Sequence, residues 1–355
     1  MTTKRIFMTG ASGCIGHYIA QSMIQETEYD LYFLVRNQEK LQFDYKHPCV
    51  TILQADMREI DRFRDILETI DVAVLVATAW GGPQEVFEVN VAKTVQLVQL
   101  LNPNVCQQAI YFSTASILDS NNQLLQEADE LGTDYIRSKY DCYRELSKLS
   151  IAPPITVLFP TLVFGGGDDQ PYSHLSADLP EIVKWIDLVR FFQADGSFHF
   201  IHGRDIATVV RYLIDYPPTP TPTPTPATVP TPTLKGGTTG TKPACAGYNG
   251  RMGEKSPISR QLVLGNEPIA VNEAVAEICQ YLEKRIYFRL PLYIWLADLL
   301  ILLLRAIGVK IEIAPWDKFC MRRRHFTYKD AVNPATLGLP SYCPTLSDVL
   351  KISGI

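Results

Sequence analysis

The feature that most constrains this chain is a regular alternation of short apolar runs and helix-length stretches between Lys4 and about Phe164. The runs are rich in β-branched and aromatic residues and show no polar face, as strands do when both sides of a parallel sheet are covered. The stretches between them are long enough for crossover helices, which parallel strands require. The alternation therefore predicts an α/β protein with a doubly wound parallel sheet.

The predicted elements can be placed by residue. Strands are expected at Arg5–Met8, Leu31–Val35, Val50–Leu53, Val72–Val76, Ala109–Phe112 and Ile155–Phe159. Helices are expected at Ile15–Glu26, Asp61–Thr69, Pro83–Leu101 and Thr133–Leu149. The pattern loosens beyond Gly165, so the sequence divides into residues 1–165 and a smaller C-terminal part, residues 166–355, that completes the sheet.

An insert of different composition interrupts the C-terminal part at about 217–260. Residues 217–232 contain eight of the 24 prolines, mostly in a Thr-Pro alternation, and a Gly/Thr/Lys-rich stretch follows. Prolines fix φ and remove backbone donors, so this segment is expected to be an extended or disordered excursion. A surface loop and a docking segment for a partner both fit. Regular structure is expected to resume at Gln261, with a helix over Val271–Lys284.

Composition narrows the class of function. A net charge of -5 provides no general basic field, which argues against nucleic acid as a partner. The eight cysteines are scattered without a CxxC pair or a Cys/His cluster, a pattern that favours reduced thiols and no metal site. The N-terminal apolar run, Ile6–Met8, is too short for a signal peptide. We therefore expect a cytoplasmic protein.

A second apolar stretch, Leu290–Leu304, leaves membrane association open. It is apolar apart from Asp298, and as a helix it would measure about 22 Å, short of the roughly 30 Å hydrocarbon core. A helix that caps an apolar cavity and a helix that lies on a membrane surface both fit, and Arg322–Arg324 would favour anionic lipid. The sequence leaves the oligomeric state open, a homodimer included.

A glycine-rich turn, Thr9–Gly16, joins the first strand to the first helix. Glycines at every third position allow a tight turn and the close approach of a pyrophosphate to bare backbone at the helix N-terminus. This position in an alternating sheet predicts dinucleotide binding. The residues expected to hold the phosphates are Gly10, Ala11, Ser12, Gly13, Cys14, Ile15 and Gly16.

The end of the second strand bears on which dinucleotide is bound. An NAD site places Asp or Glu there to bind the ribose hydroxyls, whereas an NADP site supplies a cation. This chain has Arg36 after Val35 and no acid. Because a guanidinium can pair with a 2′-phosphate, we expect NADP, with NAD as the alternative.

Tyr135 and Lys139 stand four residues apart in a predicted helix, so they share one helix face. A tyrosine with an ordinary pKa near 10 is a poor acid–base catalyst at neutral pH, but a nearby ammonium favours the phenolate. The lysine can also hold a nicotinamide ribose. The pair predicts a tyrosine acid–base catalyst.

Together these motifs resemble the extended short-chain dehydrogenase/reductases of the NAD-dependent epimerase/dehydratase family, which implies a Rossmann fold for residues 1–165 and substrate binding by residues 166–355. The likeness covers about 1–215 and, more weakly, 261–355. It implies further cofactor contacts after the third and fourth strands, in the following helix and in the segment Leu158–Gly165. These contacts are Asp56, Met57, Ala77, Thr78, Ala79, Asn90, Pro160, Leu162 and Val163.

The sequence departs from the family at one catalytic position. The family's fifth strand usually ends in Ser-Ser-Ser/Thr, whose third hydroxyl binds the substrate oxygen, and here Ala115 takes that place. Thr114 or Ser116 could supply the hydroxyl after a one-residue shift, and Ser116 is slightly favoured.

The leading hypothesis is an NADP-dependent oxidoreductase that transfers hydride between NADP(H) and a carbonyl or alcohol of a small substrate, which the apolar stretch hints is hydrophobic. One alternative is a nucleotide-sugar epimerase or dehydratase, with Arg190, Arg204 and Arg260 as loose candidates for pyrophosphate contacts. Another is a non-catalytic NADP(H) sensor, which would explain the displaced hydroxyl.

Overall fold

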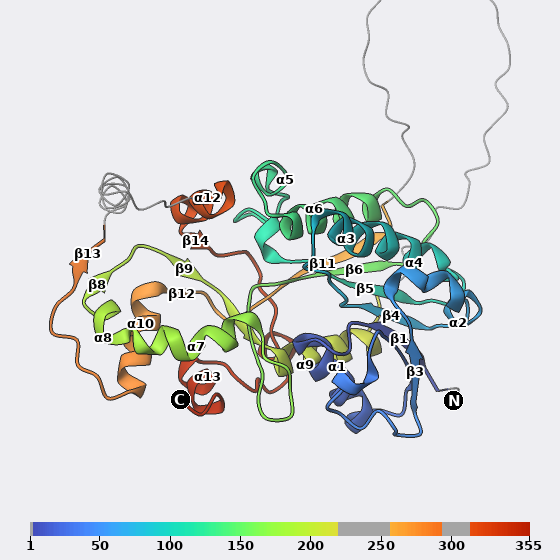
Figure 1. The fold of residues 1–355 in the computed structure, drawn as a ribbon, viewed down its shortest axis with the longest axis horizontal. Coiled ribbons are helices and arrows are strands. Elements are labelled where there is room, and N and C mark those ends of the chain that lie inside the picture. Colours follow the sequence, from blue (N-terminus) through green and yellow to red (C-terminus); the bar gives the residue numbers. More distant parts are fainter. Residues whose placement is uncertain (1–2, 219–255, 293–312) are drawn as a thin grey trace, which may run out of the picture.

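The protein is described by a computed structural model that covers residues 3–218, 256–292 and 313–355 (Figure 1). Its centre is a seven-stranded sheet with the order β11-β6-β5-β4-β1-β2-β3, in which all neighbours are parallel. This confirms the predicted fold class. The strands are β1 (Arg5–Thr9), β2 (Asp30–Val35), β3 (Val50–Gln54), β4 (Val72–Leu75), β5 (Gln108–Phe112), β6 (Ile155–Pro160) and β11 (Ile258–Leu264).

Helices cover both faces of the sheet because successive strand residues point to opposite sides. Ile6 and Met8 pack with α1 (Cys14–Glu26) and α9 (Gly203–Asp215) on one face. Phe7 belongs to the core of the other face, beneath α6 (Asp134–Ser147) and the continuous stretch of α3, η3 and α4. That stretch consists of α3 (Pro83–Phe87), the π-helical turn η3 (Glu88–Lys93) and α4 (Thr94–Leu100).

Two predicted boundaries are wrong for local reasons. The helix expected at Asp61–Thr69 is instead the 3-10 helix η2 (Met57–Phe63) followed by α2 (Arg64–Leu67), since Asp56 and Glu59 form a capping box that starts the helix earlier. Strand β11 begins at Ile258, inside the predicted insert. Its first residues alternate between partly buried and exposed at the sheet edge, so no continuous apolar run marks them. Residues 219–255 of the insert lie outside the described residues.

The second half of the chain builds a smaller unit at the left of Figure 1 around a third core. Its helices are α7 (His174–Lys184), α8 (Ile186–Val189), α10 (Val271–Tyr281) and α13 (Leu346–Ile352). Helix α12 (Pro315–Arg323) instead packs through Trp316 against the core beneath α6. Its short strands are β7 (Leu162–Phe164), β8 (Phe192–Gln193), β9 (Ser197–Phe198), β10 (Phe200–His202), β12 (Ile269–Ala270), β13 (Leu290–Pro291) and β14 (His325–Phe326). The remaining short helices are η1 (Gln38–Lys40), η4 (Ala115–Ile117), α5 (Gln126–Glu130) and η5 (Ala335–Leu337).

The helix predicted over Leu290–Leu304 does not begin at Leu290. Leu290 and Pro291 form β13, and the Leu290 N–H donates to the Phe191 carbonyl at 2.8 Å, so these residues pair with β8. The rest of that prediction, from residue 293, lies outside the described residues. Within the described parts of the chain, no helix has both the length and the apolar character needed to cross a membrane.

Candidate active site

A cavity of about 680 Å³ opens at the carboxyl ends of β1 and β4, where the strand order reverses. In open α/β sheets this crevice is where ligands bind. Most of the residues that the sequence predicts for the site line it. They are Gly10, Ser12, Gly13, Cys14, Ile15, Gly16, Arg36, Asp56, Met57, Ala77, Thr78, Ala79, Thr114, Tyr135, Lys139, Pro160, Leu162 and Val163.

The glycine-rich turn forms the floor of the cavity. Gly10 has φ +79°, and a Cβ there would lie 2.6 Å from the Ala77 nitrogen. A Cβ on Gly16 would collide with the Gly10 carbonyl. Gly13 is the N-cap of α1, whose first turn contains no acidic residue. The first-turn N–H groups therefore form an anion site at a bare backbone, which fits a dinucleotide pyrophosphate. Ala11 is fully buried and does not line the cavity.

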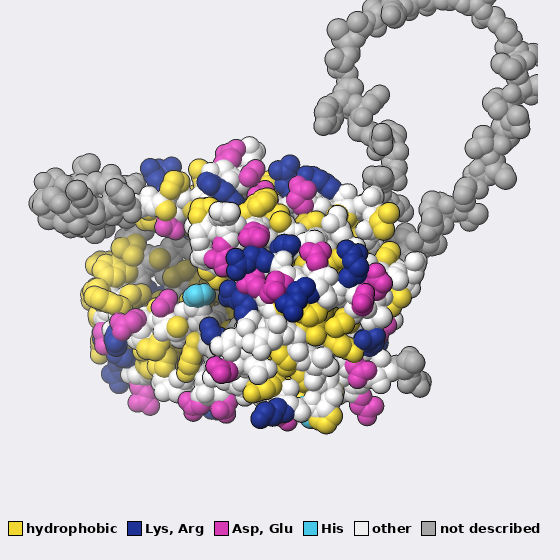
Figure 2. Space-filling view, turned by 45° about the vertical axis from the view of Figure 1, so that its right-hand side comes forward, with side chains coloured by type: hydrophobic (Ala, Val, Ile, Leu, Met, Phe, Trp, Pro, Cys, Tyr) yellow, Lys and Arg dark blue, Asp and Glu magenta, His cyan; other side chains and the backbone are white. Residues whose placement is uncertain are grey.

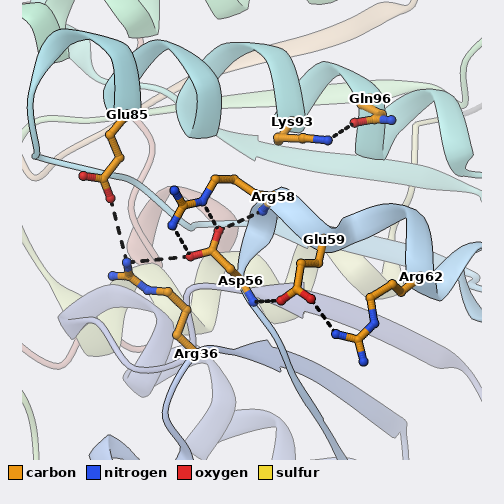
Figure 3. A network of polar contacts seen from close by, with 8 residues as sticks. All are labelled: Arg36, Asp56, Arg58, Glu59, Arg62, Glu85, Lys93 and Gln96. Carbon is orange, nitrogen blue, oxygen red and sulfur yellow. Dashed lines mark hydrogen bonds and ion pairs between the residues drawn. The ribbon is translucent and has the colours of Figure 1, made fainter.

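A network of charged residues surrounds the rim at the end of β2 (Figure 3). Arg36, with a side chain 70% exposed, lies between two carboxylates, 4.0 Å from Asp56 Oδ2 and 3.9 Å from Glu85 Oε1. Arg58 binds Asp56 through Nε and Nη2 at 2.8 and 3.1 Å, which lowers the pKa of that carboxyl. Lys40 lines the same rim. Arg36 is thus positioned by carboxylates yet open to solvent.

Tyr135 and Lys139 lie one turn apart on α6, which Thr133 caps by accepting from the Ile136 N–H. Lys139 is 2% exposed; its Nζ donates to the Phe112 carbonyl at 2.8 Å, and burial lowers the pKa of this ammonium to about 8. Its Nζ is 5.9 Å from the centre of the Tyr135 ring. Burial raises the pKa of Tyr135 to about 12, against a side-chain hydrogen bond to Thr114 that lowers it. Tyr135 is therefore protonated at neutral pH, and the lowering of its pKa by Lys139 that the sequence predicted is wrong for this state of the site, since burial outweighs it.

Thr114 rather than Ser116 stands beside Tyr135, which reverses the slight preference drawn from the sequence. Thr114 lines the cavity and hydrogen-bonds with Tyr135. Ser116 is outside the lining, one residue into η4, with its backbone N–H and its hydroxyl both 3.3 Å from Thr114 Oγ1. Because the chain turns into a 3-10 helix directly after Thr114, Ser116 is carried away from the cavity.

Asn90 does not line the cavity, although the family resemblance implies a cofactor contact. It is 1% exposed on the π-helical turn η3. Its side chain accepts from the Ala79 N–H at 2.7 Å and donates to the Ala79 carbonyl and to Ser138 Oγ at 3.1 and 3.0 Å. Asn90 therefore ties the loop after β4 to helix α6 and positions both walls of the cavity.

Several lining residues were not predicted. Trp80 stacks on Tyr135 with ring centres 4.0 Å apart, and its edge meets the His174 ring at 5.2 Å. Its place directly after the predicted Ala77–Ala79 turn is the signal that could have revealed it. The segment Pro171–Leu175, which leads into α7, carries no motif, and only the packing of the second unit brings it to the cavity. Lining residues that the sequence did not predict include Lys40, Trp80, Glu85, Thr161, Pro171, Tyr172, His174 and Leu175.

The glycine-rich turn, the tyrosine–lysine pair and the parallel sheet belong to a part of the chain that matches a known family. The model of the NAD dependent epimerase/dehydratase family matches residues 6–223, more than half of the chain. The chain belongs to this family, whose members are enzymes that use a nicotinamide dinucleotide and act on small molecules. A curated relative, sterol demethylase protein B of Methylococcus capsulatus, is 25% identical over 226 residues. That match spans 61% of this chain and 66% of the length of the relative.

Solved structures of similar fold cover nearly the whole chain. A mutant of UDP-glucuronic acid 4-epimerase from Bacillus cereus, in complex with a fluorinated UDP-sugar and NAD, has a TM-score of 0.57 at 15% identity. It covers 98% of this chain and 97% of its own. A nucleoside-diphosphate-sugar epimerase from Pseudomonas aeruginosa has a TM-score of 0.58 at 13% identity and covers 99% and 96%. At these identities the likeness establishes the fold.

Proposed function

We propose that this protein is an NADP-dependent oxidoreductase acting on a carbonyl or alcohol of a small hydrophobic molecule. The observation that carries the proposal is the placement of Tyr135, Thr114 and Lys139 in one cavity with the glycine-rich turn. When bound, the dinucleotide supplies hydride transfer at its nicotinamide. The chain's residues then supply binding, orientation and proton transfer.

In this proposal Tyr135 transfers the proton of the substrate oxygen. Its raised pKa keeps the hydroxyl protonated, as carbonyl reduction requires. Thr114 holds the substrate oxygen beside Tyr135. Lys139, fixed by the Phe112 carbonyl, binds the ribose and places positive charge below Tyr135 when protonated. The glycine turn and the α1 N-terminus hold the phosphates.

The preference for NADP rests on the rim at the end of β2. Arg36 and Lys40 provide cations there, and Arg36 extends into solvent where a 2′-phosphate would lie. Asp56 is already engaged by two guanidinium nitrogens of Arg58, so it is a poor acceptor for ribose hydroxyls. Both features favour a phosphorylated ribose.

A hydrophobic substrate fits the wall formed by residues 166–355 and the loop after β4. Trp80, Tyr172 and Leu175 line the cavity, and Trp80 stacks on Tyr135. The name of the curated relative, a sterol demethylase protein, supports an apolar substrate. For a nucleotide sugar, the cations Arg190, Arg204 and Arg260 would have to contact a pyrophosphate, and none of them lines the cavity.

The test compares cofactor binding and turnover in three matched variants. Calorimetry is expected to show tighter binding of NADPH than of NADH, and a screen of apolar ketones to reveal a substrate.

Tyr135→Phe should retain NADPH affinity and lose roughly 10²–10⁴-fold in turnover. Thr114→Val should lose turnover strongly, whereas Ser116→Ala should not. Full activity of Tyr135→Phe would contradict the mechanism; tight NADPH binding with no turnover of ketones or nucleotide sugars would favour a sensor.

A further inference from the structure

An exposed apolar surface lies at the end of the molecule away from the sheet, where α8 and β13 meet. We call it the α8–β13 patch. It consists of Ile182, Trp185, Leu188, Val189, Tyr287, Phe288, Leu290 and Leu292. Trp185, Phe288 and Tyr287 are 61%, 57% and 75% exposed. Figure 2 shows hydrophobic side chains gathered at the left end of the molecule, over these elements. An apolar surface of this extent marks an interaction site.

The two segments that form the patch are held together by backbone pairing. The N–H groups of Leu290 and Leu292 donate to the carbonyls of Phe191 and Gln193, each at 2.8 Å. Phe191 stacks on Phe288 with ring centres 5.1 Å apart. The two segments that carry the exposed side chains are therefore joined by a fixed frame, and none of these side chains lines the cavity.

Cations outnumber carboxylates in the two segments that carry this surface. Residues 181–190 and 283–292 contain five cations (Lys184, Arg190, Lys284, Arg285 and Arg289) and three carboxylates (Glu181, Asp187 and Glu283). Two of the carboxylates are paired, Glu181 with Lys184 at 2.5 Å and Asp187 with Lys284 at 2.5 Å. Arg285 is exposed, and no ion pair to it occurs among the described residues. Arg190, 19% exposed, also pairs with Asp187 at 3.3 Å. The two segments therefore carry a net positive charge, with Arg285 as its exposed cation, although the chain as a whole carries -5.

We propose that the α8–β13 patch binds the surface of an anionic lipid membrane. Tryptophan and tyrosine are favoured at the interface between headgroups and acyl chains, where leucine and phenylalanine enter the apolar layer. The net positive charge of the two segments adds attraction to anionic headgroups. A second copy of the chain fits less well, because a two-fold contact would set the same surplus cations against each other.

The point at which the described chain leaves this surface agrees with a lipid partner. Leu292 is the last residue of the patch, and the sequence that follows, Tyr293–Leu304, is apolar apart from Asp298. The sequence that directly follows the patch is thus apolar as well, with Asp298 as its one charged residue.

Sedimentation with vesicles tests the proposal on the full chain. The wild type is expected to bind phosphatidylcholine vesicles that contain phosphatidylserine, and to bind pure phosphatidylcholine vesicles more weakly. The triple variant Trp185→Ser, Leu188→Ser, Phe288→Ser should lose binding by at least about tenfold. Ile151→Ser is the matched control, since Ile151 is 75% exposed on the loop before β6, outside the patch, and should bind as the wild type does.

A separate variant tests the electrostatic contribution to membrane binding. Arg285→Gln should weaken binding to phosphatidylserine vesicles about fivefold and leave binding to pure phosphatidylcholine unchanged. NADPH binding and circular dichroism verify that each variant is folded. As an independent measurement, brominated lipid should quench more fluorescence in the wild type than in Trp185→Phe.

Three results would overturn the proposal. The first is a folded wild type that binds neither vesicle. The second is a triple variant that binds like the wild type. The third is a triple variant that changes only the oligomeric state in sedimentation velocity, which would assign the patch to a second copy.

Discussion

At the scale of single residues, the contacts of Arg36 bear directly on cofactor choice. Its guanidinium lies near two carboxylates that belong to different elements, Asp56 after β3 and Glu85 on α3. With 70% of the side chain exposed, these contacts orient the guanidinium and add little stability. A phosphate at this rim would therefore gain a preoriented cation.

We expect Arg36→Asp to weaken NADPH binding by roughly 1.5–3 kcal/mol, because a charge-assisted contact is lost and a repelling acid is added. NADH should bind at least as well as before. Calorimetry with both cofactors measures the difference. Arg64→Asp makes the same charge change on α2, outside the cavity lining, and should alter neither affinity. Equal affinity of the wild type for both cofactors would rule out this account of specificity.

Lys139 provides a second residue-scale test, through pH. Burial lowers the pKa of this ammonium to about 8 in the folded protein, from 10.5. Between these two values the unfolded chain binds more protons than the folded one, so the wild type gains stability as pH rises. Below pH 8 the Lys139 ammonium is charged in both the folded and the unfolded state, so the free-energy cost of burying it is fully present.

The free energy of unfolding of the wild type should therefore rise relative to Lys139→Met by about 2–3 kcal/mol between pH 8 and 10.5. Groups distant from Lys139 titrate alike in the two proteins, so the difference reports Lys139 together with its titratable neighbour Cys142. Urea titrations at several pH values measure it. Two curves that stay parallel across this range would show that the ammonium is not buried at a cost.

At the scale of elements, the turn between β1 and α1 gives each glycine a different role. Gly16 lies where α1 passes closest to the turn, and an added Cβ would meet the Gly10 carbonyl. Gly13 lines the cavity, and the nearest atom to an added Cβ is the Gly10 oxygen at 3.6 Å, an ordinary contact. Gly16 is therefore needed for packing, whereas Gly13 is expected to serve the ligand.

Two alanine substitutions should separate these roles. Gly16→Ala should lower the free energy of unfolding by about 1–3 kcal/mol or more, because backbone must move to admit the methyl group. Gly13→Ala should cost about 1 kcal/mol or less as an N-cap change, yet weaken NADPH binding. Urea denaturation and calorimetry on both variants give the comparison. The idea fails if Gly13→Ala binds NADPH normally.

At the scale of the whole molecule, the chain returns from the second unit to the sheet before the proline-rich insert. Helix α9 packs against α1, and β11 then extends the sheet beside β6. The proline-rich insert connects these two elements, both of which are anchored by their own contacts. The length of the connection therefore matters little to the fold.

Deleting residues 219–255 and joining the ends with a Gly/Ser link should leave the Tm and NADPH affinity nearly unchanged. The deleted sequence is poor in large apolar residues, so it contributes little to a core. Thermal unfolding and calorimetry measure both quantities. A Tm lower by several degrees would show that the segment packs against the fold.

The parallel sheet, the glycine-rich turn and the Tyr135–Lys139 pair could all be predicted from the sequence, because each depends on a pattern of residues close together in the chain. Burial on both faces requires continuous apolar strands, and one helix turn sets the tyrosine above the lysine. The family resemblance predicted further cofactor contacts, and most of these residues line the cavity.

The contacts between residues far apart in the sequence became known from the three-dimensional structure. It placed Thr114 rather than Ser116 beside Tyr135, because the chain turns into η4 at that point. It stacked Trp80 on Tyr135, set Arg36 between Asp56 and Glu85, and assembled the α8–β13 patch from segments about a hundred residues apart. Such contacts depend on how whole elements pack, and no local spacing in the sequence encodes that packing.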